Sequence, residues 1–277
     1  MIVTQIKNEL SRLGIKPKKS LGQNFLINEG IYKKIIAAAN IKTGDTVIEI
    51  GPGLGTLTQF ILDTGADVLA VEKDYTLADY LKTKFRNNNR VTIIEGDILK
   101  FQIPDSRFQI QKYKLVGNIP YYLTSHLLRI LFENWPQPEL IILMIQKEVA
   151  QRIVAKPPHM SLLAVLVQYY STPKIMSYVS RNSFWPAPEV DSAIIKLESR
   201  IQNLESRMDT KNFFKVAGAG FAKKRKQLAN NLAVGLKIPK EKIEQQLSKI
   251  GMDTKRRAET LTIEEWQSIT NTLLPQD

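Results

Sequence analysis

Short apolar runs alternate with helix-forming segments between residues 45 and 145, and most of these runs end beside a glycine or a polar residue. Apolar runs bounded by such turn signals predict buried strands. The expected strands are Thr46–Ile50, Asp67–Glu72, Val91–Glu95, Tyr113–Val116 and Leu140–Ile145, separated by helices at Thr56–Asp63, Tyr75–Phe85 and Ser125–Trp135. This alternation predicts an α/β fold with a parallel sheet and helices on both of its faces.

The character of the chain changes after about Arg200. Before that point, further helices are expected at Glu29–Asn40, Gln146–Ala155 and Leu162–Tyr170, and strands at Lys174–Val179 and Ala193–Leu197. After it come helix-like segments rich in Lys and Arg, at Phe213–Ala222, Arg225–Val234, Lys240–Ile250 and Ile263–Leu274. We therefore expect a domain of residues 1–200 that starts with a basic arm, and a small helical domain of residues 201–277.

The formal net charge of +12, with a pI near 9.6, predicts attraction to a polyanion, either nucleic acid or an anionic membrane surface. No apolar run approaches the roughly 20 residues that span a bilayer, and Met1–Leu13 lacks the apolar core of a signal peptide. The absence of Cys excludes thiolate zinc sites and thiol catalysis, and two histidines, His126 and His159, are too few for a His-based metal site. A cytoplasmic, metal-free enzyme that binds nucleic acid and no membrane is expected.

A glycine-rich turn follows the first strand of the alternating region. Gly51, Gly53 and Gly55 have the spacing G-x-G-x-G, which differs from the G-x-G-x-x-G of pyrophosphate-binding folds. Glycine lets a ligand touch the backbone because no Cβ intervenes. A plain tight turn is the alternative, but the position after the first strand favours a ligand site.

Acidic residues end the next two strands. Glu72 lies about twenty residues beyond Gly51, where nucleotide-binding α/β folds carry a carboxylate for the ribose hydroxyls. Asp97 follows the third strand and can accept from an adenine N6 amino group, unless it only caps a helix or turn. With the glycine turn, these residues describe a pocket for an adenosine that bears an amino-acid tail, and such a ligand is S-adenosylmethionine.

The loop Asn118-Ile119-Pro120-Tyr121 follows the fourth strand, at the edge of the same pocket. Asn118 and the backbone around Pro120 offer acceptors for the two N–H groups of an exocyclic amine, which would direct its lone pair toward the methyl donor. Tyr121 could stack on an extruded base, and Phe184 could form the opposite plate. An ordinary Asn-Pro turn and a buried core aromatic are the alternatives for the loop and for Phe184.

Motifs along the whole chain resemble the ribosomal RNA adenine N6-dimethyltransferases. The motifs are Gln23-Asn24-Phe25-Leu26, Glu49 through Gly55, Val71-Glu72-Lys73-Asp74, Gly96-Asp97-Ile98, Asn118 through Tyr121, Phe184 through Ser192, and Gly251 through Leu261. The best resemblance is to the bacterial branch that dimethylates two adjacent adenines near the 3′ end of 16S ribosomal RNA in the small subunit.

The resemblance implies a Rossmann-like S-adenosylmethionine methyltransferase sheet with a small C-terminal helical domain. It implies that the cofactor is bound by Asn24, Leu26, Gly51, Gly53, Glu72, Asp97 and Asn118, and that Asn118, Pro120, Tyr121 and Phe184 hold the target adenine. Lys223, Lys224, Arg225 and Lys226 match a segment that usually has consecutive arginines in the family. Lysine preserves the charge for phosphate contacts but weakens any bidentate role, and a solvated helix face is the alternative.

Several other functions share parts of this pattern. A large-subunit ribosomal RNA adenine methyltransferase that confers antibiotic resistance has the same cofactor motifs and loop, but the tail Arg256 through Thr262 favours the small-subunit branch. An RNA-binding assembly factor without catalysis is a second alternative, and the intact site motifs speak against it. A DNA adenine methyltransferase is a third, disfavoured by Ile119. The expected partner is 16S ribosomal RNA within the small subunit or its precursor, and a monomer is expected.

Overall fold

The computed structural model describes residues 3–18, 21–103, 112–200 and 210–274. The chain divides into two compact units, one of residues 1–150 and 173–199, the other of residues 151–172 and 200–277. Composition gave no sign that residues 151–172 group with the C-terminal helices. The functional division into residues 1–200 and 201–277 stays a prediction.

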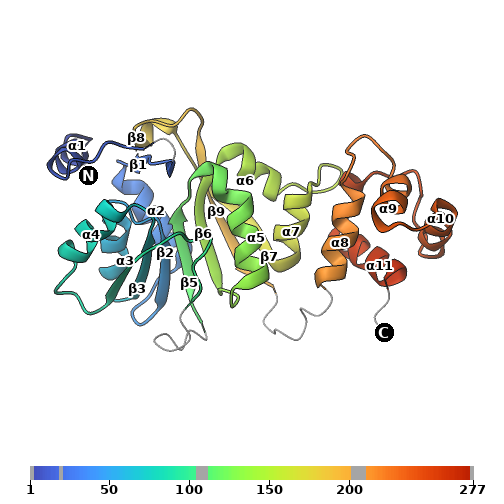
Figure 1. Cartoon of the computed structure of the whole chain (residues 1–277), viewed down its shortest axis with the longest axis horizontal. Coiled ribbons are helices and arrows are strands. Elements are labelled where there is room, and N and C mark those ends of the chain that lie inside the picture. Colours follow the sequence, from blue (N-terminus) through green and yellow to red (C-terminus); the bar gives the residue numbers. More distant parts are fainter. Residues whose placement is uncertain (1–2, 19–20, 104–111, 201–209, 275–277) are drawn as a thin grey trace. The chain divides into compact units, whose positions relative to one another are not determined.

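A mixed sheet with strand order β4-β3-β2-β5-β6-β9-β7 forms the centre of the first unit (Figure 1). Neighbours from β4 to β6 pair in parallel, and β9 joins β6 antiparallel. The strands are β2 (Thr46–Ile50), β3 (Asp67–Glu72), β4 (Val91–Glu95), β5 (Lys114–Asn118), β6 (Leu140–Gln146), β7 (Ser171–Val179) and β9 (Ser192–Ser199). The parallel part agrees with the alternation in the sequence.

Helices of the first unit fill the connections between these strands. They are α1 (Val3–Arg12), α2 (Glu29–Ala39), α3 (Thr56–Leu62), α4 (Tyr75–Lys84), α5 (Thr124–Asn134) and α6 (Lys147–Ile153), which runs on into the second unit. Strand order reverses between β2 and β5, because the chain moves outward to β4 and then returns to the other side of β2. In open α/β sheets, ligands bind at such a switch point, beyond the carboxyl ends of the strands.

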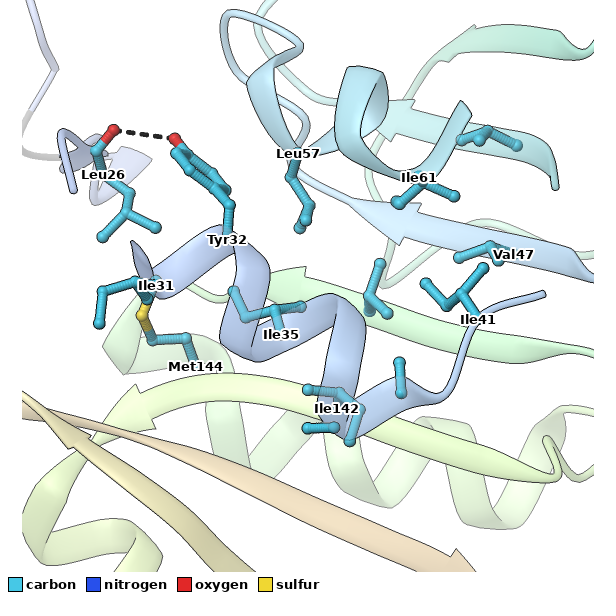
Figure 2. Packing of buried hydrophobic residues seen from close by; sticks show 14 of the residues in the cluster. Leu26, Ile31, Tyr32, Ile35, Ile41, Val47, Leu57, Ile61, Ile142 and Met144 are labelled. Atoms are coloured by element: carbon cyan, nitrogen blue, oxygen red, sulfur yellow. Dashed lines mark hydrogen bonds between the residues drawn. The ribbon is translucent and has the colours of Figure 1, made fainter. Parts of the chain in front are cut away.

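One face of the sheet is covered by α2, α3 and α4. Ile35 of α2, Ile61 of α3 and Leu81 of α4 are fully buried with Val47 and Val116 of the sheet in one apolar cluster. Figure 2 shows part of this cluster, with Ile31 beside Met144 and the Tyr32 hydroxyl pointing at the Leu26 carbonyl. This burial stabilises the sheet and holds the strand ends in place.

A second, two-stranded sheet pairs β1 (Phe25–Leu26) with β8 (Phe184–Trp185). Neither strand was expected from the sequence, since two residues give no periodic pattern. The basic arm includes α1, where Ile6 and Leu10 are 2% exposed and pack with Leu54 and Leu77. The N-terminal segment is thereby joined to the first unit by apolar contacts.

The second unit is helical. It contains α7 (Leu162–Tyr170), α8 (Thr210–Gly220), α9 (Leu228–Leu236), α10 (Lys240–Lys249) and α11 (Ile263–Leu273), around a core that includes Phe213, Leu232 and Trp266. Gly220 lies against Trp266, and Phe221 stacks on the same ring at 5.5 Å. The close approach of α8 to α11 thus depends on the missing side chain at position 220.

We predict opposite effects for two glycine substitutions in α8. A Cβ at Gly220 would collide with the buried Trp266 ring, so Gly220→Ala should lower the free energy of unfolding by about 1–3 kcal/mol. Gly218 has no atom within 4 Å of its Cβ position, so Gly218→Ala should be neutral or stabilising by about 0.5–1 kcal/mol. Urea denaturation of both variants measures this, and equal effects would contradict the assigned packing.

Candidate active site

The glycine turn between β2 and α3 has three residues in the left-handed region. Gly51, Gly53 and Gly55 have φ values of 65°, 59° and 73°, which other residues rarely adopt. The Gly51 N–H donates to the Val71 carbonyl at 3.0 Å, which fixes the turn to β3. Only the Asn118 carbonyl oxygen, at 3.9 Å, lies within 4 Å of a Cβ built on Gly51, so this backbone is open to a ligand.

Glu72 closes the turn from the side of β3. Its carboxylate accepts from the Gly53 N–H at 3.0 Å and from the Asp74 N–H at 2.9 Å, and the residue is 6% exposed. Burial raises the pKa of Glu72 above its usual value, although these two N–H donors oppose the shift. The carboxylate lies in the wall of a cavity, where its remaining lone pairs can accept from hydroxyl groups.

Asp97 lies in the same wall, just after β4. It accepts from the Lys73 ammonium at 2.8 Å and from the Leu99 N–H at 3.0 Å. Partial burial works against ionisation, but the hydrogen bond and charge of Lys73 outweigh it and hold the pKa of Asp97 below its usual value. Asp97 is therefore an ionised acceptor at neutral pH.

Asn118 ends β5 and is oriented by the N-terminal segment. Its Nδ2 donates to the Asn24 carbonyl oxygen at 3.0 Å. A carbonyl can only accept, so the amide nitrogen is used there and Oδ1 is the acceptor that remains for a ligand. The Pro120 carbonyl accepts from the Leu123 N–H at 2.9 Å and retains a second lone pair.

The two tyrosines after Pro120 have different environments. The Tyr121 hydroxyl shares a 2.6 Å hydrogen bond with Ser192 Oγ, and burial raises the pKa of Tyr121. Tyr122 is 59% exposed and borders the cavity. The predicted stacking residue Tyr121 thus lies beside the cavity with its hydroxyl group in a hydrogen bond, and Tyr122 is the aromatic ring on the rim.

Phe184 is 3% exposed and belongs to the apolar core. It pairs with Leu26 across β1 and β8, so it supports the cavity wall from behind. The Leu26 carbonyl accepts from the Tyr32 hydroxyl at 2.8 Å (Figure 2). A role for Phe184 as the second plate for a base stays a prediction and would require its ring to become accessible.

Most of the predicted site residues surround one cavity of about 130 Å³. Its lining includes the predicted cofactor-binding residues and Pro120: Asn24, Leu26, Gly51, Gly53, Glu72, Asp97, Asn118 and Pro120. The structure therefore brings together residues from the N-terminal segment and from the ends of β2, β3, β4 and β5. Tyr121 and Phe184 lie outside this lining.

Glu49 is a cavity residue that sequence reasoning left without a role. It is 1% exposed, and its carboxyl group accepts from the Thr58 hydroxyl at 2.6 Å. Burial raises the pKa of Glu49 to about 8, so the carboxyl group is mainly protonated at neutral pH. Its place two residues before the first glycine was the available signal.

The four basic residues Lys223, Lys224, Arg225 and Lys226 are exposed in a turn between α8 and α9. The expected helix start at Arg225 is wrong, because α9 begins at Leu228. The Lys226 N–H closes the turn on the Lys223 carbonyl at 3.0 Å, and Asn231 Nδ2 donates to the same oxygen at 3.0 Å. The turn borders a cavity of about 210 Å³ that is also lined by Asn230 and Val234.

The sheet topology, the glycine turn and the strand-end carboxylates define a nucleoside-binding protein of the α/β class. A family model described as ribosomal RNA adenine dimethylase matches residues 14–274, and the chain belongs to this family. This confirms the predicted family, fold class and enzyme class. It supports S-adenosylmethionine as the methyl donor.

Similar proteins agree over nearly the full length. The Ribosomal RNA small subunit methyltransferase A of Dehalococcoides mccartyi strain CBDB1 is 44% identical over 268 residues, 97% of this chain and 92% of the relative. The protein of that name from Clostridium botulinum strain Langeland is 42% identical, over 96% of this chain and 97% of its own.

Two solved structures share the fold over most of the chain. A dimethyladenosine transferase from Plasmodium falciparum has a TM-score of 0.77 and 28% identity, covering 88% of this chain and 95% of its own. The 23S rRNA methyltransferase ErmE has a TM-score of 0.71 and 25% identity, covering 90% and 99%.

We predict that Glu49→Gln raises the free energy of unfolding relative to the parent, and that this gain increases with pH. The pKa of Glu49 rises from its ordinary value of 4.5 to about 8 on folding, so its contribution to stability is full below about pH 4.5 and is lost as the pH rises through 8. Gln removes this loss and can still accept from Thr58. The difference in unfolding free energy between variant and parent should grow between pH 5 and 8 by about 2–4 kcal/mol. Denaturation at both pH values measures it, and a pH-independent difference would contradict the raised pKa.

Proposed function

We propose that this enzyme transfers methyl groups from S-adenosylmethionine to the N6 atoms of two adjacent adenines near the 3′ end of 16S ribosomal RNA during ribosome biogenesis. The observation that carries the proposal is the 42–44% identity, over nearly the whole chain, to proteins named Ribosomal RNA small subunit methyltransferase A. The large-subunit enzyme ErmE has the same fold at 25% identity and is the second candidate.

The cavity residues fit S-adenosylmethionine. Its sulfonium supplies an activated methyl group, so positioning and electrostatics dominate and no strong base is required. Glu72 accepts from the ribose hydroxyls, and Asp97 accepts from the adenine amino group. The open backbone at Gly51 lies against the amino-acid tail, where a Cβ would fill the space, and Gly53 belongs to the same turn.

Asn118 holds the target amine. An exocyclic amine is a poor nucleophile because its lone pair is delocalised into the ring. Asn118 Oδ1 and the Pro120 carbonyl accept its two N–H groups and direct the lone pair toward the methyl group. Tyr121 stacks on the extruded base, with Phe184 on the opposite side.

The basic turn binds the RNA backbone. Lys223 through Lys226 are exposed and adjacent, which suits phosphate contacts that carry no sequence information. The net charge of +12 supports attraction to RNA over a wider surface.

The proposed partner is 16S ribosomal RNA within the small subunit or its precursor, and the proposed state is a cytoplasmic monomer that binds no membrane. Among the helices of the described residues, none is long and apolar enough to cross a bilayer. A non-catalytic assembly factor is a further alternative, and the family match and the gathering of the predicted cofactor-binding residues around one cavity speak against it.

A methyl-transfer assay tests the proposal. The purified protein should label small-subunit particles that lack the modification and should leave protein-free large-subunit RNA unlabelled. Asn118→Ala should lower the rate by more than about tenfold because the amine loses an acceptor, while RNA affinity stays nearly unchanged. Labelling of large-subunit RNA alone would favour the second candidate, and an equally active variant would remove Asn118 from the mechanism.

A charge reversal tests the basic turn separately. Lys224→Glu with Arg225→Glu should weaken RNA affinity and flatten its dependence on salt, because fewer counterions are released on binding. Cofactor affinity, measured by calorimetry, should stay unchanged. Filter binding at several salt concentrations gives the slope, and a slope equal to that of the parent would exclude this turn from the RNA contact.

A further inference from the structure

Gly22 makes an unusually close contact with the catalytic loop. A Cβ built on Gly22 would lie 2.8 Å from Pro120 Cβ and 3.2 Å from Pro120 Cα, and Gly22 has φ +61°. Any side chain would therefore collide with the proline and would also strain the backbone. Only glycine lets the N-terminal segment lie directly on Pro120.

The contact is two residues away from the hydrogen bond that orients Asn118. The Asn24 carbonyl accepts from Asn118 Nδ2 at 3.0 Å, and Asn24 Nδ2 donates back to the Gly22 carbonyl at 3.3 Å. Gly22 and Asn24 thus form one short folded segment. A shift of Gly22 away from Pro120 moves the Asn24 carbonyl away from the Asn118 amide.

The same segment is anchored on its other side. Gln23 Nε2 donates to Asp74 Oδ2 at 3.1 Å, and Gln23 Oε1 accepts from the Lys18 N–H at 2.8 Å. The Lys18 ammonium forms a 2.8 Å ion pair with the same Asp74 oxygen. Asp74 is 2% exposed and also caps α4 through the Thr76 N–H. A buried, multiply bonded carboxylate makes this a rigid anchor.

We propose that Gly22 is a positioning residue for methyl transfer, which acts through the Asn24 carbonyl on the side chain of Asn118. With Asn118 Nδ2 held by Asn24, the amide presents its oxygen to the target amine. Without that bond the amide can rotate and present N–H donors, which repel the N–H groups of the amine. The inference rests on the proposed function, because it concerns the same reaction.

Gly14 provides a matched control. Gly14 also has a positive φ, +64°, and lies eight residues before Gly22 in the chain, but no atom lies within 4 Å of its Cβ position. Gly14→Ala thus imposes the same kind of backbone strain as Gly22→Ala without the collision with Pro120. Thermal unfolding of both variants compares their stability.

Single-turnover methyl transfer to small-subunit particles, at saturating cofactor and RNA, tests the proposal. Gly22→Ala should lower the rate about tenfold or more, while its RNA affinity, measured separately by filter binding, stays within about twofold of the parent. Gly14→Ala should stay within about twofold in both. Equal rates for the two variants, or a loss in RNA affinity at an unchanged rate, would overturn the proposal.

A double-mutant cycle separates positioning from general damage. Because Gly22 acts through Asn118, adding Gly22→Ala to Asn118→Ala should change the rate by less than about twofold. If the rate of the double variant fell by the product of the two single losses, Gly22 would act independently of Asn118, which would contradict the proposal.

A second variant covers the case in which Gly22→Ala does not fold. Gln23→Ala releases the anchor on Asp74 and should lower the single-turnover rate roughly threefold or more, again without a change in RNA affinity. An unchanged rate would count against the proposal. A parent protein inactive on both small-subunit particles and large-subunit RNA would instead refute the proposed function, so the two failures are distinguishable.

Discussion

The parallel pairing of β2 with both β3 and β5 is the constraint on which the site depends. In register, Ile50 of β2 faces Val71 on one side and Gly117 on the other. The residues that follow these three are Gly51, Glu72 and Asn118. The backbone pairing therefore places all three at the same edge of the sheet. A slip of one residue would turn the side chain of Glu72 or Asn118 to the opposite face of the sheet, away from the Gly51 turn. The apolar burial of Val47, Val68 and Val116 on one face therefore fixes the chemistry at the strand ends as well as the fold.

The strand ends leave one side of the cavity to a segment outside the sheet. Residues 21–26 cross this side, joined to the loop after β5 by Gly22 and Asn24 and to the start of α4 by Gln23. The pairing of Phe25 with Trp185 continues the same connection toward β8. The proposed cofactor pocket and the proposed amine-binding loop consequently share a wall, in which the Asn24 carbonyl accepts from Asn118 Nδ2. This accounts for the presence of an N-terminal motif in a site otherwise built from strand ends.

Local patterns were sufficient to predict the parallel strands. Thr46–Ile50, Asp67–Glu72 and Val91–Glu95 have the predicted bounds, because each is a short apolar run closed by glycine or charge. Features set by distant contacts were beyond such reasoning. The helix expected from Arg225 instead starts at Leu228, where Asn231 and the Arg256 carbonyl hold the preceding turn. The burial of Phe184, and the placement of Tyr122 rather than Tyr121 on the cavity rim, likewise depend on pairing and packing between segments far apart in sequence.

The acidic groups of the cavity and the net positive charge of the protein have opposite signs. This difference favours the cationic cofactor in the cavity and the anionic RNA on the surface. The chain carries a net charge of +12, yet carboxyl groups of Glu49, Glu72 and Asp97 line the cavity. A basic surface attracts the RNA polyanion over many ångströms, whereas the buried carboxyl groups act only at contact. Because burial keeps Glu49 mainly protonated at neutral pH, the cavity wall avoids the full repulsion of three carboxylates. A cationic ligand such as the proposed sulfonium lowers the free energy of the ionised form, so its binding and the ionisation of Glu49 favour each other. An anionic RNA phosphate has no favourable electrostatic interaction with these carboxyl groups and is attracted to the basic surface instead.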